Sequence, residues 1–158
     1  MISSALIAAM IAIECPSGDA RQIVHDHGEL SYGILCMRSQ ALIDVNHHYA
    51  TSLKMHDLLD RTTAIQACIA YLSIYCTRRR LGHEPTDEDY ARTWVGGPGG
   101  PWRGSSLAYW RLVQKHLTTA GAPTGSEQPS RDRGAIGAQC AEQSCPVGDH
   151  IPAVATSL

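Results

Sequence analysis

Apolar residues recur at helical spacing near the start of the chain. Those between positions 6 and 13 repeat every three or four residues, which predicts a helix. Ser3 or Ser4 can cap its first turn. Pro16 ends it, because the residue before a proline disfavours helical backbone angles. Glu14 therefore falls in the last turn of a largely apolar helix.

Four further segments have the periodicity or capping residues of helices. We expect them at about 38–48, from near 60 to 76, at 87–94 after a Thr86 cap, and from about 106 to 117. Glycine and proline predict a turn-rich loop at 96–101, and residues 17–32 read as an irregular loop. A minor β-hairpin within 23–36 stays open. The fold class expected is mostly α, a helical domain with at most that hairpin.

The character of the chain changes at about residue 118. Beyond it Gly, Pro, Ser, Thr and Ala dominate, and the hydrophobic periodicity stops. Such a composition buries too little apolar surface to offset the entropy of ordering. We expect a domain over 1–118 and a low-complexity, disordered tail over 119–158.

Charge and length exclude several classes of function. The 158 residues carry a formal net charge of −2, so a general affinity for nucleic acid is not expected. The run 78–80, three arginines, is the one basic cluster, and its ordinary role is solvated charge at the end of a helix. The apolar N-terminal segment lacks the basic start of a signal peptide and is too short for a bilayer. We therefore expect a buried first helix and no stable membrane insertion.

The cysteines and histidines do not predict a metal site or a cofactor. The six cysteines contain no C-x-x-C pair and do not form a recognisable disulfide framework. His25, His27, His47 and His48 supply imidazoles, but their spacing does not suit a single zinc ion. We expect neither metal nor cofactor.

Glu14 is the strongest candidate for acid chemistry. A carboxylate at a helix C-terminus meets the negative end of the helix dipole, and burial also disfavours its charged form. Both effects raise its pKa, which a general acid working near neutral pH needs.

Four segments in order carry a family resemblance. They are Glu14 at its helix end, Gly33-Ile34-Leu35-Cys36, Trp94-Val95-Gly96-Gly97, and Ser105 to Val113, which contains Tyr109. Together they resemble the goose-type lysozyme and soluble lytic transglycosylase superfamily, with its Glu-Ser-x-Gly, Gly-Leu-Met-Gln, Ala-Tyr-Asn-x-Gly and Glu-Thr-x-x-Tyr-Val motifs. The resemblance covers about residues 5–117. The chain departs from it where Cys15 replaces a Ser, Cys36 a Gln and Val95 an Asn, and where Pro16 and Ser17 alter the loop after the acid.

The resemblance implies a lysozyme-like fold and cleavage of the MurNAc-β-1,4-GlcNAc bond of peptidoglycan. Glu14 would be first general acid and then base, leading to hydrolysis or to the anhydro product of a lytic transglycosylase. Asp26 is the preferred second acid over Asp19 and Glu29. The expected substrate-binding residues are Ser31, Tyr32, Gly33, Cys36, Trp94, Val95, Gly96 and Tyr109. The expected partner is the glycan strand, met by a monomer at the bacterial cell wall.

Two other classes of function stay open. The losses of hydrogen-bonding capacity at Cys36 and Val95 suit a non-catalytic glycan-binding or phage-structural protein on a degenerate lysozyme fold. A nucleophilic Cys15 or Cys36 would need a histidine partner, and the sequence specifies none.

Overall fold

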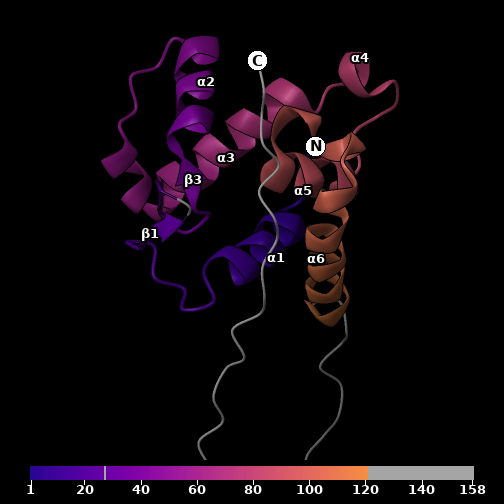
Figure 1. Ribbon diagram of the computed structural model, residues 1–158, viewed down its shortest axis with the longest axis horizontal. Coiled ribbons are helices and arrows are strands. Elements are labelled where there is room, and N and C mark those ends of the chain that lie inside the picture. The colour runs from indigo at the N-terminus through magenta and orange to yellow at the C-terminus, as the bar shows by residue number, and fades with distance from the viewer. Residues whose placement is uncertain (27, 121–158) are drawn as a thin grey trace, which may run out of the picture. The chain divides into compact units, whose positions relative to one another are not determined.

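The computed structural model describes residues 1–26 and 28–120, with the side chains of Asp26 and Ala120 outside that description (Figure 1). The expected mostly helical fold is confirmed. The elements run in the order α1 (Ser4–Glu14), β1 (Ile23–Asp26), β2 (Glu29–Tyr32), β3 (Met37–Arg38), α2 (Ser39–Tyr49), η1 (Met55–Leu59), α3 (Arg61–Tyr75), α4 (Arg78–Leu81), α5 (Asp87–Gly96), η2 (Gly97–Trp102), η3 (Gly104–Ser106) and α6 (Leu107–Ala120), where η marks a 3-10 helix. The tail predicted over 119–158 lies, beyond Ala120, outside the described residues and stays a prediction.

Helix α1 carries Glu14 into the interior. The Ser3 hydroxyl caps it by accepting the Leu6 backbone N–H at 3.0 Å. At the other end, the Cys15 N–H reaches the carbonyl of Ile11 at 2.8 Å, and Pro16 follows. The helix packs against α6 and α5, as Figure 1 shows for α6. Its apolar surface joins the common core, to which α1, the segment after β2, β3, α2, η1, α3, α5 and α6 all contribute buried residues.

The region predicted as an irregular loop contains a small antiparallel sheet. Strands β1 and β2 form the hairpin that the sequence left open, with Val24 opposite Ser31 and Asp26 opposite Glu29. Strand β3 adds two residues, with Arg38 opposite Ser31. Because opposite residues in an antiparallel pair share a face, Val24, Ser31 and Arg38 lie on one side of this sheet.

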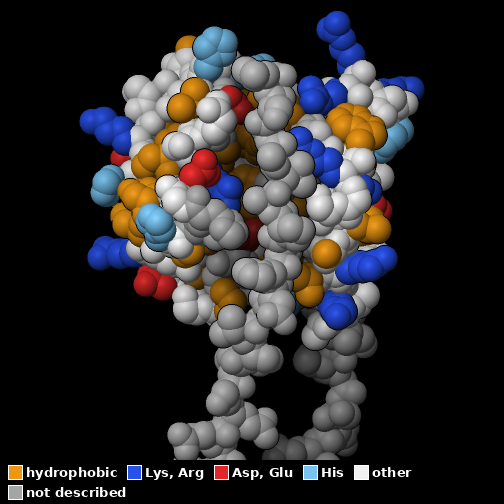
Figure 2. Space-filling model, in the orientation of Figure 1, with side chains coloured by type: hydrophobic (Ala, Val, Ile, Leu, Met, Phe, Trp, Pro, Cys, Tyr) orange, Lys and Arg blue, Asp and Glu red, His pale blue; other side chains and the backbone are white. Residues whose placement is uncertain are grey.

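Two short segments differ from the expectation. The three arginines at 78–80 do not end the preceding helix: they form α4, capped by the Thr77 side chain and closed by Gly82 at φ 82°. Figure 2 shows basic side chains gathered around α4. The loop expected at 96–101 is largely the 3-10 helix η2, because side chains bind its carbonyls. Arg80 donates to the carbonyl of Pro98 at 3.1 Å and Ser106 to that of Gly100 at 2.6 Å.

No helix within residues 1–26 and 28–120 is long and apolar enough to cross a bilayer.

Gly33 joins the sheet to the helical part through a close backbone approach. Its φ is +75°, and a Cβ at this position would lie 2.0 Å from the carbonyl oxygen of Leu58 in η1. We expect Gly33→Ala to lower the free energy of unfolding by more than about 2 kcal/mol, since backbone strain and overlap add. Urea denaturation measures this.

Gly18 provides the matched control. Its φ is +72°, but a Cβ there would meet no atom within 4 Å. Gly18→Ala should cost only about 1–2 kcal/mol, the strain alone. Equal losses in the two variants would contradict the proposed role of the Leu58 contact.

Candidate active site

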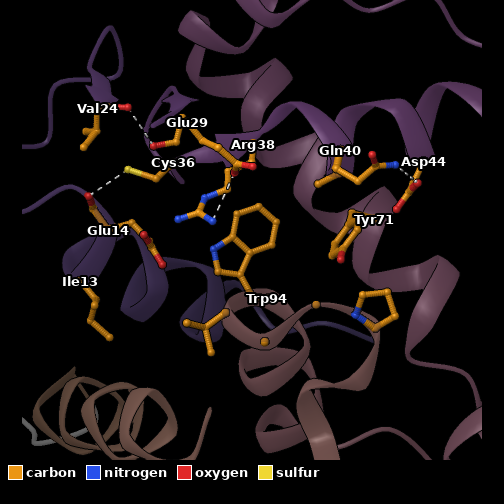
Figure 3. A pocket seen from close by; sticks show the side chains of 16 residues that line it. Ile13, Glu14, Val24, Glu29, Cys36, Arg38, Gln40, Asp44, Tyr71 and Trp94 are labelled. Carbon is orange, nitrogen blue, oxygen red and sulfur yellow. Dashed lines mark hydrogen bonds and ion pairs between the residues drawn. The ribbon is translucent and has the colours of Figure 1, made fainter. Parts of the chain in front are cut away.

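A groove of about 690 Å³ opens beside the end of α1 (Figure 3). One wall comes from the sheet and α2, and the other from the end of α5 and the start of η2. Tyr71 of α3 lies at the far end from Glu14. The lining residues are Ile13, Glu14, Val24, Glu29, Ser31, Cys36, Arg38, Gln40, Ala41, Asp44, Tyr71, Trp94, Val95, Gly96, Gly97 and Pro98.

Glu14 is half-buried at the near end of this groove. Burial is the main cause that raises the pKa of its carboxyl above the ordinary value. Hydrogen bonding from the Tyr109 hydroxyl and the Trp94 indole, and the positive charge of Arg38, offset part of that rise. In Figure 3 the indole and the guanidinium lie on the carboxyl's side of the groove. The site therefore favours the protonated acid while leaving it accessible.

Tyr109 of α6 closes the space behind Glu14. Its side chain is buried, and its hydroxyl finds no partner of good hydrogen-bonding geometry within residues 1–26 and 28–120. The same hydroxyl nevertheless acts on the Glu14 carboxyl as a weak donor, and the nearby carboxyl and burial raise the pKa of Tyr109 far above its usual range. We interpret the pair as facing groups held just outside ideal hydrogen-bonding geometry. This hydroxyl is well placed to solvate Glu14 when the acid ionises.

Gln22 ties the end of α1 to the sheet. Its side-chain Nε2 donates to the carbonyl oxygen of Glu14 at 3.1 Å, to that of Gly33 at 3.3 Å and to the Cys36 sulfur at 3.1 Å. The Cys36 thiol itself donates to the Glu14 carbonyl at 3.4 Å. Gln22 also accepts the Gly33 N–H on its own carbonyl at 2.9 Å. These contacts fix the backbone of Glu14 relative to the groove wall.

The cysteines near the acid are thiols. Burial is the largest cause that raises the pKa of Cys36, to about 11, and the Glu14 charge adds to it. Cys15, Cys36, Cys68 and Cys76 are all free, and Cys140 and Cys145 lie outside the described residues. A thiol with a raised pKa is a poor nucleophile, so the site does not favour Cys36 in that role.

Two acids on the sheet bear on the search for a second carboxyl group. Glu29 lines the groove and pairs with Arg38 at 3.4 Å, although both side chains are half or more exposed. Asp26 lies opposite Glu29 in the register, two residues from Val24, but its side chain is outside the described part. Asp19, also considered, lines a separate pocket beside Asp60.

The far end of the groove combines a carboxylate with aromatic rings. Asp44 accepts from Gln40 at 3.1 Å and from the Tyr75 hydroxyl at 2.8 Å. Tyr71 contacts Trp94 edge-on, with ring centroids 6.0 Å apart. Figure 3 shows the Tyr71 ring between Trp94 and Asp44.

The structure brings six of the predicted site residues to the groove. They are Glu14, Ser31, Cys36, Trp94, Val95 and Gly96. Tyr32 does not line it, because neighbouring strand residues face opposite ways, and its ring packs edge-on against His56 at 5.6 Å. Gly33 instead packs on Leu58, and Tyr109 lies behind Glu14.

Sequence reasoning missed Gln22, Arg38, Asp44 and Tyr71. The Gln40–Asp44 spacing of four on one helix could have indicated a paired face. Gln22 gave no local signal.

Among the described residues, no group of three or more His, Cys, Asp or Glu side chains is arranged to hold a metal ion. Of the four histidines considered in the sequence, His27 lies outside the described residues.

Comparison with solved structures defines the class of fold. The chain resembles the lysozyme of Tapes japonica with a TM-score of 0.63 and 24% identity, over 72% of this chain and 89% of that one. It resembles the Meretrix lusoria lysozyme, bound to an inhibitor, with a TM-score of 0.61 and the same identity and coverage. The same lysozyme in complex with Aeromonas hydrophila PliI gives 0.62. The fold is therefore lysozyme-like, as the motif order predicted.

No protein family model matches the chain, and no curated protein matches it.

The Gln22 contacts give a test of the site's framework. We expect Gln22→Met, which keeps the length but removes the donor, to lower the free energy of unfolding by about 1 kcal/mol. In Gln22→Glu the introduced carboxylate would face two carbonyl oxygens, so its charged form is disfavoured and its pKa rises. The free energy of unfolding of Gln22→Glu should therefore be close to that of Gln22→Met at acidic pH and fall below it as pH increases. Urea denaturation across pH measures both.

Gln66, exposed on α3, supplies the control. Gln66→Met and Gln66→Glu should stay within about 0.5 kcal/mol of the parent at every pH. A Gln22→Glu variant whose stability loss is independent of pH would argue against the carbonyl contacts.

Proposed function

We propose that the protein cleaves the glycan strands of peptidoglycan as a muramidase, with Glu14 as the acid. One observation carries this proposal: a half-buried carboxyl with a raised pKa lines the groove of a lysozyme-like fold. A carboxyl in this state is protonated at a pH where exposed glutamates are ionised. It can then donate to a glycosidic oxygen lying in the groove.

Glu14 would act twice in the reaction. It first gives its proton to the glycosidic oxygen as the bond from that oxygen to the sugar's anomeric carbon breaks. Arg38, Trp94 and Tyr109 are the groups that stabilise the resulting carboxylate. Glu14 then takes a proton from the water that attacks the anomeric carbon. Attack by the sugar's own 6-hydroxyl would give the anhydro product of a lytic transglycosylase instead.

A second carboxylate would stabilise positive charge at the anomeric carbon. Asp26 is our proposal for this role, and its register next to groove-lining Val24 and Glu29 supports it. Glu29 is the competitor, since it lines the groove directly. Its pairing with Arg38 at 3.4 Å weakens its case, because that cation already offsets its charge.

A non-catalytic glycan-binding protein is the second candidate. Val95 presents an exposed apolar side chain to the groove, and the Cys36 thiol is engaged within the protein. Neither offers a sugar the polar contact that an Asn or Gln would. Both candidates place the protein on glycan strands at the bacterial cell wall, as a monomer.

Activity on purified peptidoglycan tests the proposal. We expect Glu14→Gln to lower the rate of solubilisation at least ~100-fold, the usual contribution of a general acid. Asp26→Asn should also lower it strongly, and Glu29→Gln only weakly. The parent's rate should fall as pH rises through the raised pKa of Glu14, because the acid then loses its proton. Turbidity measures the rates.

Glu84→Gln is the control, since that acid is exposed and pairs with Arg78 away from the groove. Mass spectrometry of the products separates a reducing end from an anhydro end. Full activity in Glu14→Gln would rule out the assigned acid. An inactive parent that still binds glycan would establish the non-catalytic class.

A further inference from the structure

The far end of the groove has a chemistry of its own. Three carboxyl groups and one guanidinium line the groove: Glu14, Glu29, Asp44 and Arg38. Glu29 pairs with Arg38, whereas Asp44 forms no ion pair with any described residue. Within the described part of the chain, its oxygens accept from two neutral donors, the Gln40 amide and the Tyr75 hydroxyl. These donors fix the carboxylate in place without neutralising its charge.

Two aromatic rings lie along the groove on one side of this carboxylate. Tyr71 and Trp94 both line the groove, and Tyr71 lies between Trp94 and Asp44 in Figure 3. Aromatic faces attract cations, and more strongly where water is partly excluded. A fixed carboxylate beside two aromatic rings is suited to an ammonium group, which gains a charge-assisted hydrogen bond and a cation–π contact.

Arg80, which lies over the Tyr75 ring, is engaged by other groups. Arg80 stacks over the rings of Tyr75 and Trp102 at 5.4 and 5.9 Å and donates to the carbonyl of Pro98. Its charge slightly lowers the pKa of Tyr71, but burial dominates and raises that pKa to about 12. Tyr71 is therefore a neutral wall of the site.

We propose that Asp44, Tyr71 and Trp94 form a subsite for a primary ammonium group of the substrate. The proposal rests on the function proposed above, and it adds a preference in substrate class. Two parts of a bacterial cell wall supply this chemistry: a glucosamine that has lost its N-acetyl group, and the side-chain amine of a diamino acid in the peptide stem.

Binding measurements separate this subsite from catalysis. The full chain carrying Glu14→Gln is titrated calorimetrically with fully N-acetylated chitooligosaccharide, with its de-N-acetylated counterpart, and with a stem peptide bearing a free or an acetylated side-chain amine. We expect tighter binding of a ligand with a free amine. In the double variant Glu14→Gln with Asp44→Asn, the preference for the free amine over the acetylated form should fall about tenfold. That is the scale of one charge-assisted hydrogen bond.

Two variants serve as controls. Tyr75→Phe removes a hydrogen bond to Asp44 but keeps the charge, so most of the preference should remain. Glu84→Gln removes an exposed negative charge outside the groove and should leave the preference unchanged. Asp44→Asn should remove the protein's preference for the free amine in one of the two ligand pairs, sugar or stem peptide, and that pair identifies the source of the amine.

Some results would overturn the proposal. Equal affinity for amine and acetylated ligands in the parent would do so, and so would equal weakening of both by Asp44→Asn. The comparison of affinities in the parent tests the subsite even if the protein binds glycan without cleaving it. Absence of any glycan binding, together with no activity on peptidoglycan, would instead remove the proposed function itself.

Discussion

Placing one carboxyl group among apolar neighbours is the constraint around which this structure is arranged. Burial of Glu14 penalises its charged form, and only Tyr109, Trp94 and Arg38 offset that penalty. The acid is tolerated because burial favours its protonated form and because α5 and α6 close behind it. The groove leaves one side of it open. The residue whose burial is unfavourable for its charged form is thus also the proposed acid, as is common at functional sites.

The position of the acid depends on contacts that join distant parts of the chain. Helix α1 stops at Glu14 because Pro16 follows, and its end is then held by Gln22 and Cys36. Gly33 brings the sheet against η1 through its backbone. Together these contacts hold the helix end against the sheet that forms one groove wall. Asp44 and Tyr71 lie at the far end, and Trp94 lies between them and Glu14, so the proposed acid and the proposed ammonium subsite are centred at different places along one groove.

Much of the fold and part of the site could be predicted from local signals. Hydrophobic spacing and capping residues located α1, α2, α3, α5 and α6 to within a few residues, and Pro16 placed Glu14 at a helix end. The 3-10 helix η2 could not be predicted, because side chains of Arg80 and Ser106 stabilise it from elsewhere in the sequence. Gln22 was missed for the same reason: its partners are eight and fourteen residues away. The hydrogen bond between Asp44 and Tyr75 joins residues that are thirty-one positions apart.

The most direct measurement is the titration of the Glu14 carboxyl itself. Carbon-13 NMR of the protein labelled at glutamate side chains follows each carboxyl across pH, and Glu14→Gln assigns the signal. We predict that the pKa of the Glu14 carboxyl lies above the ordinary glutamate value, because burial is the largest influence on it. Titration of Glu14 at the ordinary glutamate value would mean that the carboxyl is hydrated, and would contradict the central claim.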